Sequence, residues 1–379
     1  MDYDVIVIGA RCAGAATALQ LARGGKRVLL LDRSKPGTDT MSTHALMRGA
    51  VIQLERWGLL DRLLATGVPE VTRTVFSYGE ETVAVDIRPA HGTRSLIAPR
   101  RYVLDRILAE AAIEAGAHIE YGTSFVDVTR GVHGEITGVV FDGPGRRMEA
   151  CAPLVIGADG RRSTVARRVG ACVLQTAEHA TQCVYAYVKG LPDTGYQWFY
   201  QPGLAAGAIP THNGAHCVFA SAKGERLRPM LRNLGAEAAL RQLVAETNSA
   251  FAQQLSSVRV VTRPLVYGGE PGFMREAAGA GWALVGDAGY FKDPLTAHGI
   301  TDAFRDADLL ASAILNGRSL YDYEATRNAY SSEFFDITNR IAGMDWTMRE
   351  LKELHLRLNL IMKAEQATMA VDAPVSLAA

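Results

Sequence analysis

The glycines near the N-terminus have the types and spacing of a turn that binds phosphate. The segment Gly9–Gly14, GARCAG, lies between a short apolar run, Asp4–Ile8, and a helical stretch that begins at Ala13. Asp32 ends the next apolar run, roughly 20 residues further on, where such units place an acid that binds a ribose hydroxyl. Free N–H groups at the start of a helix attract phosphate. We therefore predict a dinucleotide site here, in which Arg11 replaces the usual middle glycine and either crowds the phosphates or adds a cation beside them.

Two further segments that contain glycine and aspartate follow apolar runs later in the chain. Asp159-Gly160 comes after Leu154–Ile156, and Gly286-Asp287 comes after Ala283–Val285. An aspartate at the carboxyl end of a strand can accept hydrogen bonds from hydroxyl groups, and a helix that begins close by can stabilise an anion. Each segment on its own is also typical of an ordinary turn.

The elements around these segments indicate a parallel sheet. The first 32 residues have the pattern of a strand–helix–strand unit, and such units build parallel sheets with right-handed crossovers. A helix is predicted over 42–64, with Ser42 or Thr43 as its N-cap, and another over 102–115.

The second half of the chain has a different pattern. Between 176 and 266 aromatic and polar residues alternate, which indicates a second domain built on a mainly antiparallel sheet, with one helix at 236–249. Helices are predicted from His298 onward, and a disordered tail is predicted after Ala370. The first domain is therefore expected to be discontinuous in sequence.

Taken together, the three segments resemble those of the flavoprotein monooxygenase superfamily typified by p-hydroxybenzoate hydroxylase, whose fold is shared by flavin halogenases and geranylgeranyl reductases. The resemblance implies an α/β protein: a glutathione-reductase-like Rossmann FAD domain with an inserted, mainly antiparallel β-sheet substrate domain and C-terminal helices. The implied boundaries are 1–70, 98–175 and 267–330 for the FAD-binding domain, 71–97 and 176–266 for the substrate sheet, and 331–379 for the C-terminal helices and tail.

The resemblance also implies roles for individual residues. The first glycine loop would hold the FAD pyrophosphate, Asp32 the adenosine ribose and Asp287 the ribityl chain, while Arg101 would approach the FAD chain. The complete cofactor set is Gly9, Ala10, Arg11, Cys12, Ala13, Gly14, Asp32, Arg33, Ser42, Thr43, His44, Arg101, Asp159, Gly160, Gly286, Asp287, Pro294, Ala297, His298 and Gly299.

Some residues of this set have a second interpretation. Many relatives have Gly-Gln-Gly where this chain has Ala297-His298-Gly299, so the local flavin geometry is expected to differ. His44 is interpreted either as a satisfied core or cap histidine or as a flavin contact, covalent attachment included. Lys292 belongs to a loop that lies near the flavin in the family, but an exposed loop lysine is the default expectation.

An aromatic cluster is the candidate substrate pocket. The residues assigned to it lie on or beside the predicted sheet that would roof the flavin, and large apolar side chains there would keep water away from the reacting atoms. The alternative is that they form the sheet core. The residues are Tyr196, Trp198, Tyr200 and Pro210.

Composition excludes several classes of function. The chain has 40 Lys+Arg and 40 Asp+Glu, so it lacks the broad positive field of a protein that binds nucleic acids without sequence preference. No apolar run is long enough for a transmembrane helix. The five scattered cysteines have no CxxC spacing, which argues against a disulfide scaffold or a zinc site, and no other metal site is predicted. With no visible secretory signal, a cytoplasmic location is expected.

The activity implied by the resemblance is that of an FAD-dependent monooxygenase. Electrons would come from NAD(P)H or from a separate flavin reductase as partner, and O₂ would form a C4a-(hydro)peroxyflavin that hydroxylates a small organic, aromatic or polyketide-like substrate. Since the flavin carries this chemistry, no catalytic side chain is assigned. The sequence indicates no particular substrate or oligomeric state.

Three other activities are compatible with the same motifs. A flavin halogenase would have Trp-x-Trp-x-Ile-Pro, which the segment Tyr196–Tyr200 does not match. A reductase of C=C bonds, similar to geranylgeranyl reductase, is favoured by the loop Gly289–Pro294 and by the Tyr-x-Trp that begins at Tyr196. A flavin-binding module without catalytic activity is the third.

Overall fold

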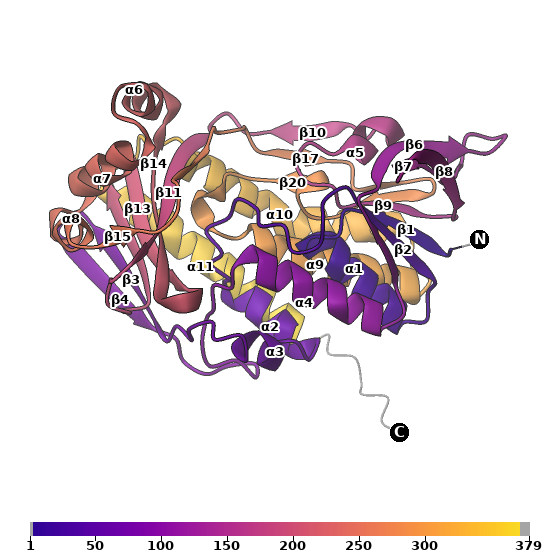
Figure 1. The fold of residues 1–379 in the computed structure, drawn as a ribbon, viewed down its shortest axis with the longest axis horizontal. Helices are drawn as coiled ribbons and strands as arrows, with labels where there is room; N and C mark the ends of the chain where they lie inside the picture. Colours follow the sequence, from indigo (N-terminus) through magenta and orange to yellow (C-terminus); the bar gives the residue numbers. More distant parts are fainter. Residues whose placement is uncertain (1–2, 372–379) are drawn as a thin grey trace.

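The computed structural model describes residues 3–371, and it contains two main sheet regions connected by long C-terminal helices (Figure 1). The predicted tail lies outside the described residues, except that the last helix extends to Val371. Among the helices of the described part, none combines the length and the apolar character that crossing a membrane requires.

A six-stranded sheet carries the three glycine-containing segments. Its strand order is β18-β19-β9-β1-β2-β5, parallel except for the β18–β19 pair. The carboxyl ends of parallel neighbours meet at one edge, so the residues that follow β1, β2, β9 and β19 come together there. The strands are β1 (Val5–Ile8), β2 (Val28–Asp32), β5 (His118–Tyr121), β9 (Val155–Gly157), β18 (Ala278–Gly279) and β19 (Trp282–Leu284).

Both faces of this sheet are covered. Val5 and Val7 pack against the helices α1 (Cys12–Arg23), α4 (Arg101–Glu114) and α9 (Gly299–Leu315). Ile6 and Ile8 point the other way, toward a three-stranded sheet. Burial on two faces explains why β1 and β2 are continuous apolar runs rather than alternating ones. The covering strands are β6 (Ser124–Arg130), β7 (Ile136–Gly143) and β8 (Arg146–Cys151).

The second region is an eight-stranded sheet, drawn at the left of Figure 1. Its strands are antiparallel neighbours except for one parallel pair, β3–β12. The order is β15-β11-β14-β13-β12-β3-β4, with β16 also paired to β11. The bounds are β3 (Arg73–Tyr78), β4 (Glu81–Asp86), β11 (Thr181–Lys189), β12 (Tyr196–Gln201), β13 (Leu204–Thr211), β14 (Ala215–Lys223), β15 (Arg259–Val260) and β16 (Leu265–Tyr267).

The two faces of the eight-stranded sheet differ in chemistry. One face has small and branched side chains and packs under α6 (Gly224–Leu234), α7 (Ala236–Thr247) and α8 (Ser249–Ser256). The other face is aromatic and packs against α10 (Leu320–Ala342) and α11 (Met348–Val371). Of the three covering helices, only α7 is predicted from the sequence.

The remaining elements join the two regions. Helix α5 (Thr164–Val169) follows β9, and a small sheet is formed by β10 (Val173–Thr176), β17 (Phe273–Arg275) and β20 (Tyr290–Phe291). Short 3₁₀ turns occupy η1 (His212–Gly214), η2 (Gly286–Ala288) and η3 (Pro294–Thr296).

The helix predicted over 42–64 is wrong at its start and in its middle. The structure has two helices instead, α2 (Arg48–Arg56) and α3 (Leu60–Leu64). His44 and Gly58 adopt positive φ values of 65° and 68°, which interrupt a right-handed helix. Met47, and not Ser42 or Thr43, is the N-cap of α2. The stretch before α2 is therefore free to line a cavity.

Candidate functional site

A cavity of about 640 Å³ is lined by both regions of the molecule. One part, which we call the nucleotide end, is lined by residues that follow β1, β2 and β9, including Gly9, Asp32 and Asp159. The other part, the sheet end, is lined by aromatic residues of the eight-stranded sheet, including Tyr185, Trp198 and Phe219. The loops after β19 and the first turn of α9 line the cavity as well.

The turn after β1 leaves no room for a side chain at its two glycines, Gly9 and Gly14. Gly9 has a φ of 106°, and a Cβ there would lie 2.5 Å from the Ala158 carbonyl oxygen. A Cβ at Gly14 would lie 1.7 Å from the Gly9 carbonyl oxygen. The backbone at the start of α1 is thus brought directly to the cavity, with the positive end of the helix dipole toward it.

Asp32 holds this turn and also faces the cavity. Its carboxylate accepts hydrogen bonds from the backbone N–H groups of Ala10, at 2.7 Å, and Ser34, at 2.6 Å. Each carboxylate oxygen has more than one acceptor position, so capacity remains for a hydroxyl group in the cavity.

Arg11 lies along the cavity and does not block it. Its guanidinium donates a 2.6 Å hydrogen bond to the Thr40 hydroxyl, and both residues line the cavity. Of the two alternatives that the sequence left open, this geometry favours a cation beside the phosphate position.

Arg101 is a second cation of the cavity wall, and hydrogen bonds to Asp105 hold its side chain in place. Its guanidinium donates to the Asp105 carboxylate at 3.1 Å, and the Cys12 thiol donates to the same carboxylate at 3.0 Å. Burial lowers the pKa of Arg101, but the charge and hydrogen bonds of Asp105, together with Cys12 and Asp287, outweigh it and the pKa is raised. Arg101 is therefore a permanent positive charge.

The two later aspartates differ in what they bind. The Asp159 carboxylate accepts from the Ser163 hydroxyl and from the N–H groups of Thr164 and Val165, so it caps α5. In contrast, within residues 3–371 no hydrogen bond reaches the Asp287 carboxylate, which lines the cavity. Burial raises the pKa of Asp287. An acceptor held in a cavity without a protein donor is suited to bind hydroxyl groups of a ligand.

His44 lies between the cavity and the aromatic face of the sheet. Its Nε2 forms a hydrogen bond with the Tyr187 hydroxyl, while Nδ1 is buried without a partner in the described structure. Burial, together with the charge of Arg100, holds the pKa of His44 well below its ordinary value. The side chain lines the cavity as a neutral imidazole.

The sheet end combines the predicted residue Trp198 with lining residues that were not predicted from the sequence. Trp198 lines it and donates from Nε1 to the Thr74 hydroxyl at 3.2 Å. The Phe219 ring packs edge-on against Trp198, with centroids 5.6 Å apart. The lining residues that we did not predict here are Cys183, Tyr185, Phe219, Ser221 and Tyr267. The alternation along β11 and β14 could have indicated them, but not which face is the open one.

Not every predicted residue lines the cavity. Tyr196 donates from its hydroxyl to the Ile97 carbonyl, and Tyr200 stacks on Tyr78, so both belong to the core behind the wall. The His298 ring turns away from the cavity toward Glu365. The predicted residues outside the lining are Ala10, Gly14, Gly286, His298, Tyr196, Tyr200 and Pro210; the predicted residues in the lining are Gly9, Arg11, Cys12, Ala13, Asp32, Arg33, Ser42, Thr43, His44, Arg101, Asp159, Gly160, Asp287, Pro294, Ala297, Gly299 and Trp198.

The site fits a dinucleotide that carries a flat aromatic group. The glycine turn offers a backbone cradle that a Cβ would fill, and Asp287 offers acceptors without a protein donor. Two arginines, Arg11 and Arg101, supply positive charge along the same wall. The first turn of α9, from Gly299, adds a helix N-terminus next to the sheet end.

Comparisons with known proteins agree with this geometry. A family model described as FAD binding domain matches residues 2–336. The menaquinone reductase of Mycolicibacterium smegmatis is 28% identical over 367 residues, covering 89% of this chain and 83% of that protein. The digeranylgeranylglycerophospholipid reductase of Methanothrix thermoacetophila is 26% identical over 335 residues, covering 84% of this chain and 80% of that protein.

Two further similarities are to enzymes that are not named as reductases. The 6-methylpretetramide 4-monooxygenase of Streptomyces rimosus is 30% identical over 184 residues, which is 47% of this chain and 32% of that protein. The solved structure of the flavin-dependent brominase Bmp2 superimposes with a TM-score of 0.81 at 17% identity, covering 97% of this chain and 94% of that one. The predicted fold class is thereby confirmed.

Proposed function

This chain belongs to the FAD binding domain family and is an FAD-dependent oxidoreductase, and from that premise we propose that it reduces C=C bonds in a prenyl-bearing substrate with electrons from NAD(P)H. The observation that carries the proposal is the extent of the similarity. The two reductases align over at least 80% of both chains, whereas the monooxygenase aligns over less than half of this one.

The sheet end supports an apolar substrate. Its wall is built from the rings of Tyr185, Trp198 and Phe219, and burying an apolar chain against such rings is favourable by about 25 cal/mol per Å². No charged side chain of the eight-stranded sheet lines the described cavity. An unsaturated hydrocarbon chain would therefore be bound by shape and burial.

The residues at the nucleotide end have binding roles in this proposal. The glycine turn and the N-terminus of α1 bind the pyrophosphate, Asp32 binds the adenosine ribose and Asp287 binds the ribityl hydroxyls. When bound, FAD supplies a two-electron centre that accepts hydride from the nicotinamide and donates hydride to the substrate. Overall the C=C bond gains two hydrogens, as one hydride and one proton, and NAD(P)H is oxidised to NAD(P)⁺.

Anaerobic turnover tests the proposal. The purified FAD-loaded protein is incubated without O₂ with NADPH or NADH, or with dithionite as reductant, and a geranylgeranyl-bearing glycerolipid. Mass spectrometry is expected to find product with two added hydrogens for each reduced bond. If all products retain their unsaturation with each of these reductants, the proposed activity is wrong.

A monooxygenase is the second candidate, because of the similarity to the Streptomyces enzyme over 184 residues. It predicts that turnover needs O₂ and that the product gains one oxygen atom. O₂ uptake that depends on substrate, measured on phenolic and polyketide-like compounds, would favour it over the reductase. NAD(P)H or a separate flavin reductase would supply the electrons in that case.

A further inference from the structure

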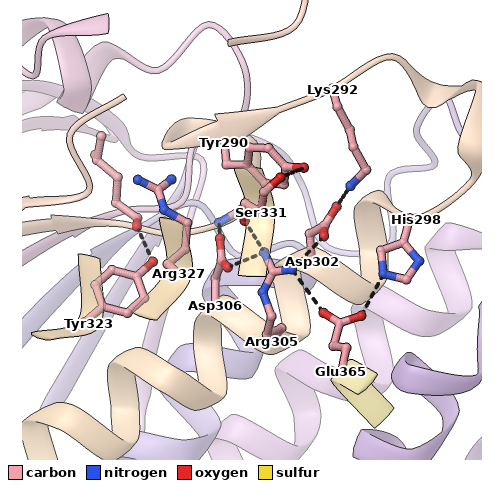
Figure 2. A network of polar contacts seen from close by, with 12 residues as sticks. Tyr290, Lys292, His298, Asp302, Arg305, Asp306, Tyr323, Arg327, Ser331 and Glu365 are labelled. Atoms are coloured by element: carbon pink, nitrogen blue, oxygen red, sulfur yellow. Dashed lines mark hydrogen bonds and ion pairs between the residues drawn. The ribbon is translucent and has the colours of Figure 1, made fainter. Parts of the chain in front are cut away.

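Lys292 is a buried lysine in the loop between β20 and η3. Its side chain is 4% exposed, and it forms an ion pair with Asp302 in the first turn of α9. The expectation of an exposed loop lysine is therefore wrong. Lys292 and Asp302 both line the cavity, so the pair lies at the boundary between the cavity and the protein interior (Figure 2).

Two aromatic rings also lie close to the ammonium group. Nζ lies 4.8 Å from the centre of the Tyr290 ring and 4.5 Å from that of Phe334 on α10. These contacts favour a cation, but they replace little of the hydration that the ammonium loses on burial.

Behind the pair lies a network of charged groups that Figure 2 shows from close by. Arg305 donates to Asp302 and to Glu365 on α11, both at 3.0 Å. Arg305 also donates to Asp306, which in turn accepts from the Gly286 N–H group at 3.1 Å. The network thus connects α9 and α11 to the turn that carries Asp287.

The charged groups around Lys292 shift its pKa in opposite directions. Burial, together with the Arg305 guanidinium, lowers the pKa of Lys292 to about 7, while Glu365, Asp287 and Asp306 act in the opposite direction. Asp302 contacts the ammonium directly and also favours the charged form. His298, in the segment before α9, forms a hydrogen bond with Glu365. Helix α10 places the Phe334 ring against the ammonium and the Ser331 hydroxyl against Arg305.

Three other members of the network, Glu365, His298 and Arg305, keep their charge near neutral pH. Hydrogen bonds and charges from His298 and Arg305 outweigh burial and hold the pKa of Glu365 at about 2. Burial lowers the pKa of His298, so it is neutral at pH 7. Arg305 is a permanent cation. Of these four side chains, Lys292 is the one that both lines the cavity and has a pKa near neutral pH.

We propose that the Lys292–Asp302 pair is a proton-exchange site of the flavin cavity, at which Lys292 takes up one proton when the bound cofactor is reduced and releases it on reoxidation. This inference rests on the proposal that the cavity holds FAD. It does not depend on whether the substrate is then reduced or hydroxylated.

The step balances in charge and protons. Two electrons and one proton added to the cofactor leave one extra negative charge in a poorly hydrated cavity. A neutral Lys292 amine that binds one proton from solvent becomes an ammonium and cancels that charge. Two electrons are then accompanied by two protons instead of one.

The chain has both kinds of cation here, which argues for different roles. An arginine is charged at all relevant pH values, whereas a buried lysine titrates. Arg305 neutralises the carboxylates permanently, and Lys292 lies on the cavity side. The donor atoms of His298, Asp302 and Glu365 lie within 4.8 Å of one another, but both carboxylates are already paired with Arg305, so we assign no metal to them.

Proton uptake during anaerobic reduction tests the proposal. The FAD-loaded protein is reduced photochemically in weakly buffered solution with a pH indicator, at pH values from about 8 to about 9, where a lysine with a pKa of about 7 is mostly neutral before reduction. The wild type is expected to take up nearly one proton more per two electrons than Lys292→Arg, whose guanidinium stays charged. Lys363→Met, at an exposed position of α11, is the control that should match the wild type.

A double variant without a change in net charge controls for misfolding, because it leaves no unpaired charge at the buried pair. Lys292→Met combined with Asp302→Asn removes both charges, while the Asn side-chain oxygen can still accept from Arg305. It is expected to bind FAD and to lose the same proton as Lys292→Arg. Equal uptake by the wild type and Lys292→Arg would overturn the proton-exchange role. Failure of the wild type to bind FAD would instead overturn the site assignment.

Discussion

The two ends of the cavity are built by different means. The nucleotide end is built around a main-chain turn, in which a Cβ added at Gly9 or Gly14 would meet the backbone of Ala158 or Gly9. The sheet end is made of large rings such as Trp198 and Phe219, which contact one another through side chains. Backbone geometry tolerates no added atom, whereas a wall of side chains can be changed one residue at a time. We therefore expect cofactor binding to fail abruptly on substitution and substrate preference to change gradually.

The largest effect is expected from Gly14→Ala. The added methyl group would lie 1.7 Å from the Gly9 carbonyl oxygen, so α1 must move away from β1. The protein should lose most of its bound FAD, measured by its absorbance near 450 nm, and should unfold at a lower temperature, because overpacking costs about 1–3 kcal/mol or more. Gly268→Ala, where a Cβ meets nothing within 4 Å, is the control. Full FAD content in Gly14→Ala would show that the nucleotide end is not the rigid part.

A smaller effect is expected at the sheet end, from a matched pair of substitutions. Phe219 lines the cavity, while Phe199 lies on the opposite face and stacks on Phe251 with centroids 4.8 Å apart. Changing either phenylalanine to leucine should cost about 1 kcal/mol of stability. Only Phe219→Leu should also raise KM for the substrate, by roughly threefold to tenfold, with FAD content unchanged. Equal KM values in the two variants would contradict a substrate wall at Phe219.

A third effect is absent at neutral pH and concerns the cluster that supports the sheet end. The Nδ1 atom of His355 forms a 2.7 Å hydrogen bond with the Tyr78 hydroxyl, and burial lowers the pKa of His355 to about 4. The unfolded chain binds this proton near pH 6.5 and the folded chain does not, so stability falls as the pH drops from 6.5 toward 4. Between pH 7 and pH 5 the contribution of His355 is a loss of about 2 kcal/mol.

Urea unfolding at the two pH values measures this loss. His355→Phe should remove about 2 kcal/mol of the pH dependence. Glu365, with a pKa of about 2, belongs to the charged network beside α9, and the stability that it contributes is present above pH 4.5 and lost only below it. An unchanged pH dependence in His355→Phe would mean that folding does not lower the pKa of this histidine.

Most of the fold could be predicted from local patterns. The runs before Gly9, Gly157 and Gly286 are buried strands because each is short, apolar and followed by a turn residue. The helix expected from Ser42 was wrong: His44 has a positive φ, and its ring forms a hydrogen bond with Tyr187, which lies 143 residues away. No local pattern contains that contact. Two of the three helices over the eight-stranded sheet were missed for a different, local reason: α6 contains Pro229 and α8 is short.

The candidate site also has one part that the sequence predicts and one part that only the tertiary structure shows. The sequence by itself determined the glycine turn, the acid at Asp32 and the order of the three segments, because backbone conformation and strand ends are fixed by residues close together in the chain. Only the tertiary structure decided that Trp198 lines the cavity while Tyr196 and Tyr200 do not, and that Lys292 is buried against Asp302. The burial and the pKa of Lys292 depend on α9, α10 and α11. These helices come together only when the chain is folded.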